Sequence, residues 1–210
     1  MDNNERLINT DHKLTSNFIG EFFIDDLSIC DDLIDFFHNS EHSKTEFKGR
    51  GITASGYDEK VKSSTDLEIP LSLNDGVLIR YLKELQKCAH KYADRFPACD
   101  ISSPWKISEN YNIQHYAPGE GFYSFHYERG STKFPMCNRH LVWMTYLNDV
   151  TDGGGTDFYH QEYTVNAEKG KTVIWPVDWT YTHRGQVSPT QEKYIITGWY
   201  SFYEKGSITT

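Results

Sequence analysis

The chain contains 210 residues, of which 38% are hydrophobic and 24% are charged, so it can bury a core and is not a disordered tail. Thirty acidic residues against 21 basic ones give a net charge of −9, which argues against non-specific binding to nucleic acid or to anionic membranes. No apolar run approaches the ~20 residues of a membrane span, and the polar residues 1–5 do not resemble a signal peptide. We therefore expect a cytoplasmic protein with no nucleic-acid partner and no membrane partner.

The first hundred residues contain two amphipathic helical patterns. Residues 25–38 and 77–96 carry apolar side chains at three- and four-residue spacing, and Pro97 ends the second pattern. Residues 64–70 between them indicate a loop or a short strand. The cysteines form no C-x-x-C pair, so we expect reduced, partly buried thiols rather than a zinc-ribbon or thioredoxin-like site; they are Cys30, Cys88, Cys99 and Cys137.

From about residue 105 the pattern changes to short runs of β-branched and aromatic residues separated by Gly, Pro, Asn and Asp. This spacing predicts a mainly β fold with supporting α-helices, built on a double-stranded β-helix (jelly-roll) core. We expect a single domain over residues 1–210, with helical support in 1–105 and the jelly-roll catalytic core in 106–205. The predicted strands are 111–117, 121–128, 139–148, 155–159, 171–177, 180–184 and 193–203.

The predicted strand 121–128, GFYSFHYE, contains a histidine and a carboxylate two residues apart. Side chains at this spacing point to the same face of a strand, so His126 and Glu128 can converge on one point. His183 from a distant strand would complete a set of two histidines and one carboxylate, which is typical of non-haem Fe(II) oxygenases. His160 and Glu162 have the same spacing but follow a Gly-rich loop, and we expect them on an exposed hairpin. A surface or structural histidine remains the alternative for either pair.

Ten residues after His183, a lysine opens the predicted strand KYIITGWYSF. Lys193, Ile195, Thr197 and Trp199 share one face of this strand. A lysine inside a β core is costly unless an anion pairs with it, and the hydroxyl of Thr197 could donate to the same anion. A dicarboxylate cosubstrate would explain both groups; the alternative is a lysine that starts the strand and points to solvent.

With these residues the chain resembles the Fe(II)/2-oxoglutarate-dependent dioxygenase superfamily, and within it the prolyl 4-hydroxylase-like branch of phage and microbial type. The resemblance covers about residues 111–203 and includes Gly154–Phe158 and the segment from Lys169 to Pro176, while residues 62–64 resemble a less specific segment at the pocket mouth. It implies Fe(II) bound by His126, Glu128 and His183, and a 2-oxoglutarate pocket in which Lys193 binds the distal carboxylate. The other pocket residues implied are Tyr116, Tyr146, Thr197 and Trp199.

One position departs from the family pattern. Most members have Asp where this chain has Glu128, although phage and marine microbial members that resemble it also carry Glu. The longer side chain requires the strand or the carboxylate to shift by roughly a bond length. The resemblance keeps Glu128 as a metal ligand but does not imply that a protein with glutamate at this position is fully active.

The resemblance also implies the reaction. Fe(II), 2-oxoglutarate and O₂, with ascorbate as a reductant, would hydroxylate a C–H bond and release succinate and CO₂. The branch suggests peptidyl proline, while other members act on other residues or on small metabolites. The expected partner is therefore a peptide, protein or small molecule. We expect the protein to act in the cytoplasm, which would be that of the host if the chain is encoded by a phage. Arg139 and Arg184 could meet a carboxylate-bearing substrate or be structural. The alternative function is a non-catalytic or differently metallated cupin-like binding module.

Overall fold

The computed structural model of the chain describes residues 17–53 and 56–203. Two helices lie where the apolar spacing predicts them, α2 (Ser28–Asn39) and α3 (Gly76–Arg95). Helix α3 begins after Asp75, whose side chain accepts a hydrogen bond from the Val77 backbone N–H at 2.8 Å. Within the described residues, no helix has the length and apolar character needed to cross a membrane.

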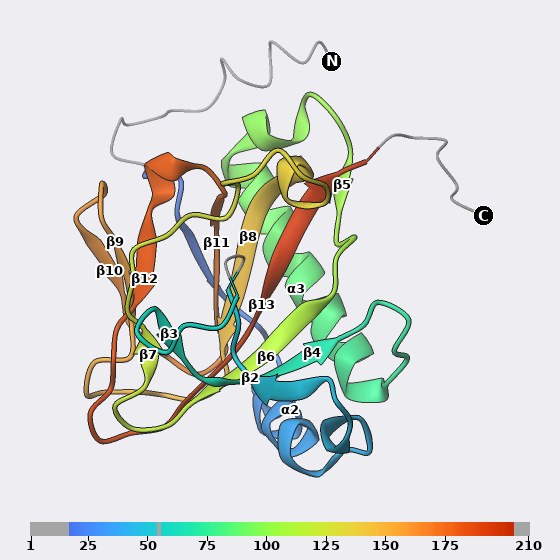
Figure 1. Cartoon of the computed structure of the whole chain (residues 1–210). Helices are drawn as coiled ribbons and strands as arrows, with labels where there is room; N and C mark the ends of the chain where they lie inside the picture. Colours follow the sequence, from blue (N-terminus) through green and yellow to red (C-terminus); the bar gives the residue numbers. More distant parts are fainter. Residues whose placement is uncertain (1–16, 54–55, 204–210) are drawn as a thin grey trace.

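Antiparallel strands make up most of the rest of the fold (Figure 1). The 8-stranded major sheet has the order β1-β11-β8-β13-β6-β4-β2, with β5 paired to β13. Its strands are β1 (Gly20–Phe23), β2 (Lys48–Arg50), β4 (Thr65–Ile69), β5 (Trp105–Lys106), β6 (Tyr111–Tyr116), β8 (Arg139–Tyr146), β11 (Lys171–Pro176) and β13 (Lys193–Phe202). A second sheet contains β10 (Tyr163–Val165), β9 (Thr156–Phe158) and β12 (His183–Gly185), and a separate pair contains β3 (Lys62–Ser63) and β7 (Gly121–Phe122).

Each face of the major sheet has its own apolar core. Along β8 the side chains alternate, so Leu141 and Trp143 pack with the helices while Val142, Met144 and Tyr146 pack toward the second sheet. Figure 1 shows α3 behind the major sheet and β9, β10 and β12 on its other side. This mostly β architecture with two supporting helices confirms the predicted jelly-roll class.

Several strand boundaries differ from the prediction. Only Gly121 and Phe122 of the predicted strand 121–128 form a regular ladder, because the chain then leaves its pairing with β3 and His126 bridges to His183 instead. In the predicted strand 180–184, residues Trp179–Tyr181 form a 3₁₀ turn, and β12 begins at His183.

The N-terminal part also contributes strands. Strand β4 lies where the sequence left a loop or short strand, and it pairs with β6. Strands β1 and β2, which we did not predict, complete the two edges of the major sheet. Both are short and carry exposed positions, so their sequences lack the alternation that marks a half-buried strand. The four cysteines are free, and Cys30 and Cys88 are buried.

Candidate active site

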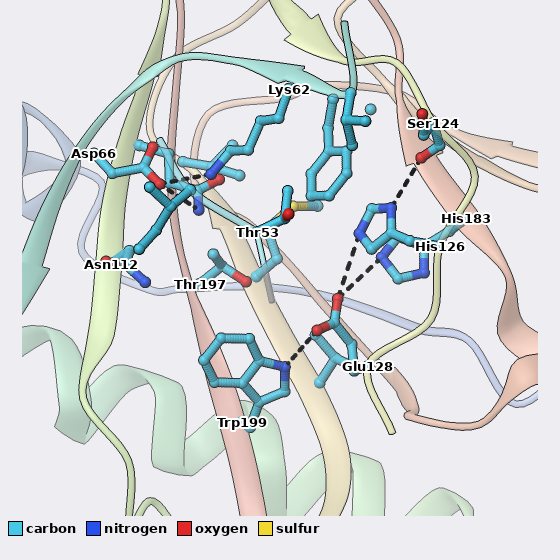
Figure 2. Close-up of a pocket in the computed structure, with 18 of the residues that line it drawn as sticks. Thr53, Lys62, Asp66, Asn112, Ser124, His126, Glu128, His183, Thr197 and Trp199 are labelled. Atoms are coloured by element: carbon cyan, nitrogen blue, oxygen red, sulfur yellow. Dashed lines mark hydrogen bonds and ion pairs between the residues drawn. The ribbon is translucent and has the colours of Figure 1, made fainter. Parts of the chain in front are cut away.

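A cavity of about 890 Å³ opens between the inner face of the major sheet and the elements opposite it, which include β3, β7 and β12. Strand β13 contributes Lys193, Ile195, Thr197 and Trp199, the four residues predicted to share one face. The predicted residues that also line it are Tyr116, His126, Glu128, Tyr146 and His183. The structure therefore brings the predicted metal ligands and cosubstrate-pocket residues to one cavity. Figure 2 labels His126, Glu128, His183, Thr197 and Trp199 among them.

The two histidines and the glutamate converge on one point of this cavity. Oε1 of Glu128 lies 3.5 Å from Nε2 of His126 and 3.6 Å from Nε2 of His183. The ligand atoms of the three residues all lie within 4.8 Å of one another. Two imidazole nitrogens and one carboxylate oxygen are the donor set of a non-haem Fe(II) site, so these residues fit that ion.

Both imidazoles are oriented by backbone carbonyls. Nδ1 of His126 lies 3.0 Å from the Ser124 carbonyl oxygen, and Nδ1 of His183 lies 2.9 Å from the Tyr181 carbonyl oxygen. These contacts assign the ring proton to Nδ1 and leave the Nε2 lone pairs facing Glu128. Phe122 stacks on the His126 ring at a centroid distance of 3.7 Å, which further fixes its plane.

The backbone itself couples the two histidines. The His126 N–H donates to the His183 carbonyl and the His183 N–H donates to the His126 carbonyl, both at 2.9 Å. The irregular segment after β7 keeps the strand-like alternation, because Phe125 and Tyr127 are exposed while His126 and Glu128 point inward. The two-residue spacing thus has the predicted consequence although the segment is not a regular strand.

The electrostatics of the site favour the protonation states that a cation needs. Burial and the neighbouring His126 together lower the pKa of His183 to about 4, so this imidazole is neutral near pH 7. Burial alone would raise the pKa of Glu128, but the adjoining imidazoles of His126 and His183, when protonated, and the guanidinium of Arg139 lower this pKa below its usual value. A neutral imidazole and an ionised carboxylate are the forms that bind a metal ion.

The second oxygen of Glu128 is bound by two side chains on the major sheet. Nε1 of Trp199 donates to Oε2 at 3.0 Å, and Nη1 of Arg139 lies 3.5 Å from the same oxygen. Trp199 was predicted to line the cosubstrate pocket; it lines the cavity, and its N–H is directed to the carboxylate. Arg139 is paired inside the protein, and Arg184 is paired with Asp157 at 3.2 Å, in line with the structural alternative for both.

Lys193 is buried, with 4% of its surface exposed, and reaches no carboxylate within ion-pair distance among the residues that the structure describes. Its Nζ donates to the Gln186 carbonyl at 3.1 Å and lies 4.5 Å from the centre of the Tyr116 ring. The strand register explains this placement, since Lys193 on β13 pairs with Tyr116 on β6. Burial lowers the pKa of Lys193 from 10.5 to about 8. A buried cation without a counter-ion is costly, so such an amine either gives up its proton or binds an anion.

Hydroxyl groups surround the same region. Tyr146 exchanges a hydrogen bond with Thr156 at 2.7 Å, and Tyr116 donates to Oε1 of Gln114 at 2.8 Å. We expected the Thr197 hydroxyl to donate to an anion in the cavity. It donates instead to the Trp143 carbonyl at 3.0 Å.

The sequence did not predict one further charged pair in the cavity. Lys62 is buried and forms an ion pair with Asp66 at 2.6 Å. Figure 2 shows this pair on the opposite side of the cavity from the two histidines. A signal was present in the two-residue spacing of Lys62, Ser64 and Asp66 along the segment that runs from β3 into β4. The Ser64 hydroxyl donates to Asp66 at 2.8 Å. The rival pair lies elsewhere, because His160 and Glu162 are exposed in the turn between β9 and β10.

A known protein family matches the part of the chain that was predicted to form the jelly-roll core. Residues 111–201 match the family model of the 2OG-Fe(II) oxygenase superfamily. No curated protein sequence matches the chain closely enough to count as a relative. The matched residues contain all the strands that line the centre of the cavity, from β6 to β13.

Solved structures of prolyl hydroxylases share the fold. The viral collagen prolyl hydroxylase of Paramecium Bursaria Chlorella virus-1, solved as a 2OG complex, aligns with a TM-score of 0.64 at 16% identity over 92% of this chain and 100% of that one. A Pseudomonas putida prolyl-4-hydroxylase aligns with a TM-score of 0.66 at 13% identity over 91% and 96%. A Trichoplax adhaerens prolyl hydroxylase, in complex with a hypoxia inducible factor peptide fragment, aligns with a TM-score of 0.69 at 16% identity over 94% and 90%.

Proposed function

We propose that this chain, a 2-oxoglutarate-dependent dioxygenase whose residues 111–201 match the 2OG-Fe(II) oxygenase superfamily, hydroxylates peptidyl proline and releases succinate and CO₂. His126, Glu128 and His183 hold the iron in this proposal, and Lys193 binds the distal carboxylate of 2-oxoglutarate. The observation that carries it is one cavity with a two-histidine, one-carboxylate group and a buried lysine without a carboxylate partner among the described residues.

When bound, Fe(II) supplies the O₂ activation that couples decarboxylation of 2-oxoglutarate to hydroxylation of the substrate. The protein holds the reactants and excludes water. Lys193, with Tyr116 beside it, orients the dicarboxylate. The Nδ1 contacts of the two histidines select the neutral tautomer whose Nε2 lone pair faces the metal position. Phe122 and Trp175 cover the two imidazoles and limit access of solvent.

The substrate assignment draws on the solved structures that share the fold. Those proteins are prolyl hydroxylases of viral, bacterial and animal origin, and one was solved with a peptide fragment. The cavity is larger than a 2-oxoglutarate molecule needs, and its far side is lined by Arg50, Lys62, Asp66 and Asn112, which leaves polar room for a peptide backbone.

An anaerobic titration tests the proposal against the cupin-like alternative. Adding Fe(II) and then 2-oxoglutarate should produce the weak visible charge-transfer band of the chelate. Once O₂ is admitted, proline-containing peptides should gain one oxygen atom per succinate formed, while the second atom of O₂ enters succinate. Metal binding without this band would favour a plain metal-binding module, and succinate formation without peptide oxidation would favour a small-molecule substrate.

A substitution series at Glu128 tests the carboxylate ligand. We expect Glu128→Asp to retain measurable binding of Co(II), because the charged oxygen is kept at a shorter reach, whereas Glu128→Gln loses much more because a neutral amide is a weaker ligand. Isothermal titration of the metal-free proteins measures both. Equal tolerance of the two substitutions would show that this carboxylate does not coordinate.

The buried lysine makes cosubstrate binding pH-dependent. Because burial lowers the pKa of Lys193 to about 8, the amine loses its charge as the pH rises through that value, and a bound carboxylate raises the pKa again by stabilising the cation. The dissociation constant for 2-oxoglutarate should therefore be lowest below about pH 8 and rise above it, by up to about tenfold per pH unit. Titrations of the Co(II)-loaded protein between about pH 7 and 9 measure this dependence. Lys193→Arg, which stays charged, should remove the slope; a slope that persists in that variant would assign it to another group.

A further inference from the structure

The carboxylate of Glu128 is held at both of its oxygens. Oε1 faces the Nε2 atoms of His126 and His183, at 3.5 and 3.6 Å. Oε2 accepts the indole N–H of Trp199 at 3.0 Å, as Figure 2 shows from the β13 side of the cavity. The side chain of Glu128 is only 15% exposed, so few water molecules compete for either oxygen.

Trp199 is in turn fixed by a buried ion pair. The guanidinium carbon of Arg139 lies 3.5 Å from the centre of the Trp199 ring. Arg139 bonds Glu109 at 2.7 Å, and the side chains of these two residues are 11% and 8% exposed. The Ser201 hydroxyl also donates to Glu109, at 3.0 Å. The indole therefore has a fixed position on the sheet against which Glu128 is set.

This arrangement fits a glutamate and not an aspartate. Glutamate is longer than aspartate by one carbon–carbon bond, about 1.5 Å, and has one more rotatable bond. On the present backbone, the shorter aspartate side chain would hold its carboxylate about one bond length farther back. It could not keep one oxygen between the two imidazoles and the other within hydrogen-bond distance of Trp199.

We propose that Trp199, supported by Arg139 and Glu109, is a positioning residue that makes a glutamate competent as the metal ligand. It holds Oε2 away from the imidazoles, so Glu128 presents the single oxygen Oε1 and leaves the remaining metal positions to cosubstrate and O₂. The inference rests on the proposed ligand set and gives Trp199 a role that it exerts through Glu128.

Co(II) binding to the metal-free protein tests it without turnover. Trp199→Phe keeps an aromatic ring for Arg139 to contact and removes the indole N–H together with the rest of the five-membered ring. We expect its Co(II) affinity to fall about tenfold to a hundredfold, the usual cost of losing a partner that orients a ligand. The visible absorption of bound Co(II), which reports coordination, should change because Oε2 loses its closer donor and keeps only the longer contact to Arg139, so it can turn toward the metal. Trp105→Phe is the matched control, because the buried indole nitrogen of Trp105 has no hydrogen-bond partner in the part of the chain that the structure describes. This substitution should change neither the affinity nor the spectrum.

The decisive comparison repeats Trp199→Phe in the Glu128→Asp protein. Since the shorter carboxylate does not reach the indole, the second substitution should then weaken Co(II) binding by less than about twofold, within the range of independent sites. An equal loss in both backgrounds, or an unchanged affinity and spectrum in Trp199→Phe alone, would overturn the inference. His183→Ala separates the two proposals: if it too binds Co(II) as the parent does, the ligand set is wrong, whereas a loss confined to His183→Ala leaves the ligand set and removes the role of Trp199.

Discussion

The His183→Ala protein is expected to lose iron-dependent consumption of 2-oxoglutarate while it keeps its fold. His183 supplies one of the three converging ligand atoms, and replacing residues that merely orient a ligand already costs 10–100-fold in metal affinity, so loss of a ligand should cost more than about a hundredfold. The bridge to His126 uses backbone groups only, and an alanine can retain it. Succinate formation measures turnover, and far-UV circular dichroism with thermal unfolding of the metal-free protein measures the fold.

His160→Ala is the control for this experiment. His160 belongs to the other His-x-Glu pair, and it is exposed in the β9–β10 turn, where its ring contacts Tyr159 and Trp179. The substitution should leave turnover nearly unchanged. Parent-like turnover in His183→Ala together with loss in His160→Ala would move the metal site to the second pair.

Lys193→Met should raise the KM for 2-oxoglutarate by roughly tenfold to more than a hundredfold. The substitution keeps most of the stem and removes the ammonium group, and a hydrogen bond to a charged group contributes about 1.5–3 kcal/mol. Metal affinity should change little, because Lys193 is not among the converging ligands. The metal-free protein should not be less stable, since the buried amine has no carboxylate partner among the described residues to lose.

Lys193→Arg refines this result. A guanidinium keeps the positive charge but presents a planar fork in place of a point charge, so we expect partial tolerance and a KM between those of the parent and Lys193→Met. If Lys193→Met binds 2-oxoglutarate as the parent does, the lysine is not the anchor for the distal carboxylate, and the cupin-like alternative gains support.

The features that the sequence predicted depend on local periodicity. Two-residue alternation predicted the shared face of Lys193, Ile195, Thr197 and Trp199, because β13 is a long regular strand that packs on both sides. The same rule placed His126 and Glu128 on one side of an irregular segment, since that segment keeps an extended backbone. The helices were predicted to within a few residues because their apolar spacing is set by contact with a single sheet face.

The features that the sequence did not predict depend on contacts between distant segments. The hydrogen bond from Trp199 to Glu128 joins two residues whose alignment follows from sheet register and from the reach of one side chain, neither of which has a local signal. The pairing of Arg139 with Glu109 is similar, since an arginine that binds substrate and one that forms an internal ion pair look alike in a sequence. The change of pairing after Phe122 could not be predicted either, because an extended segment reads as a strand whichever neighbour it pairs with.

The reciprocal backbone bridge between His126 and His183 has a consequence for how the protein folds and holds its metal. The two residues are far apart in the chain, so the site can form only after the intervening strands have closed a long loop, a slow non-local step. An ion that binds only the folded chain then stabilises the closed loop. At a free ion concentration one hundred times its dissociation constant, it adds about 2.7 kcal/mol to the free energy of unfolding. Local opening of the His126–His183 bridge, and not only unfolding of the whole domain, would release the ion.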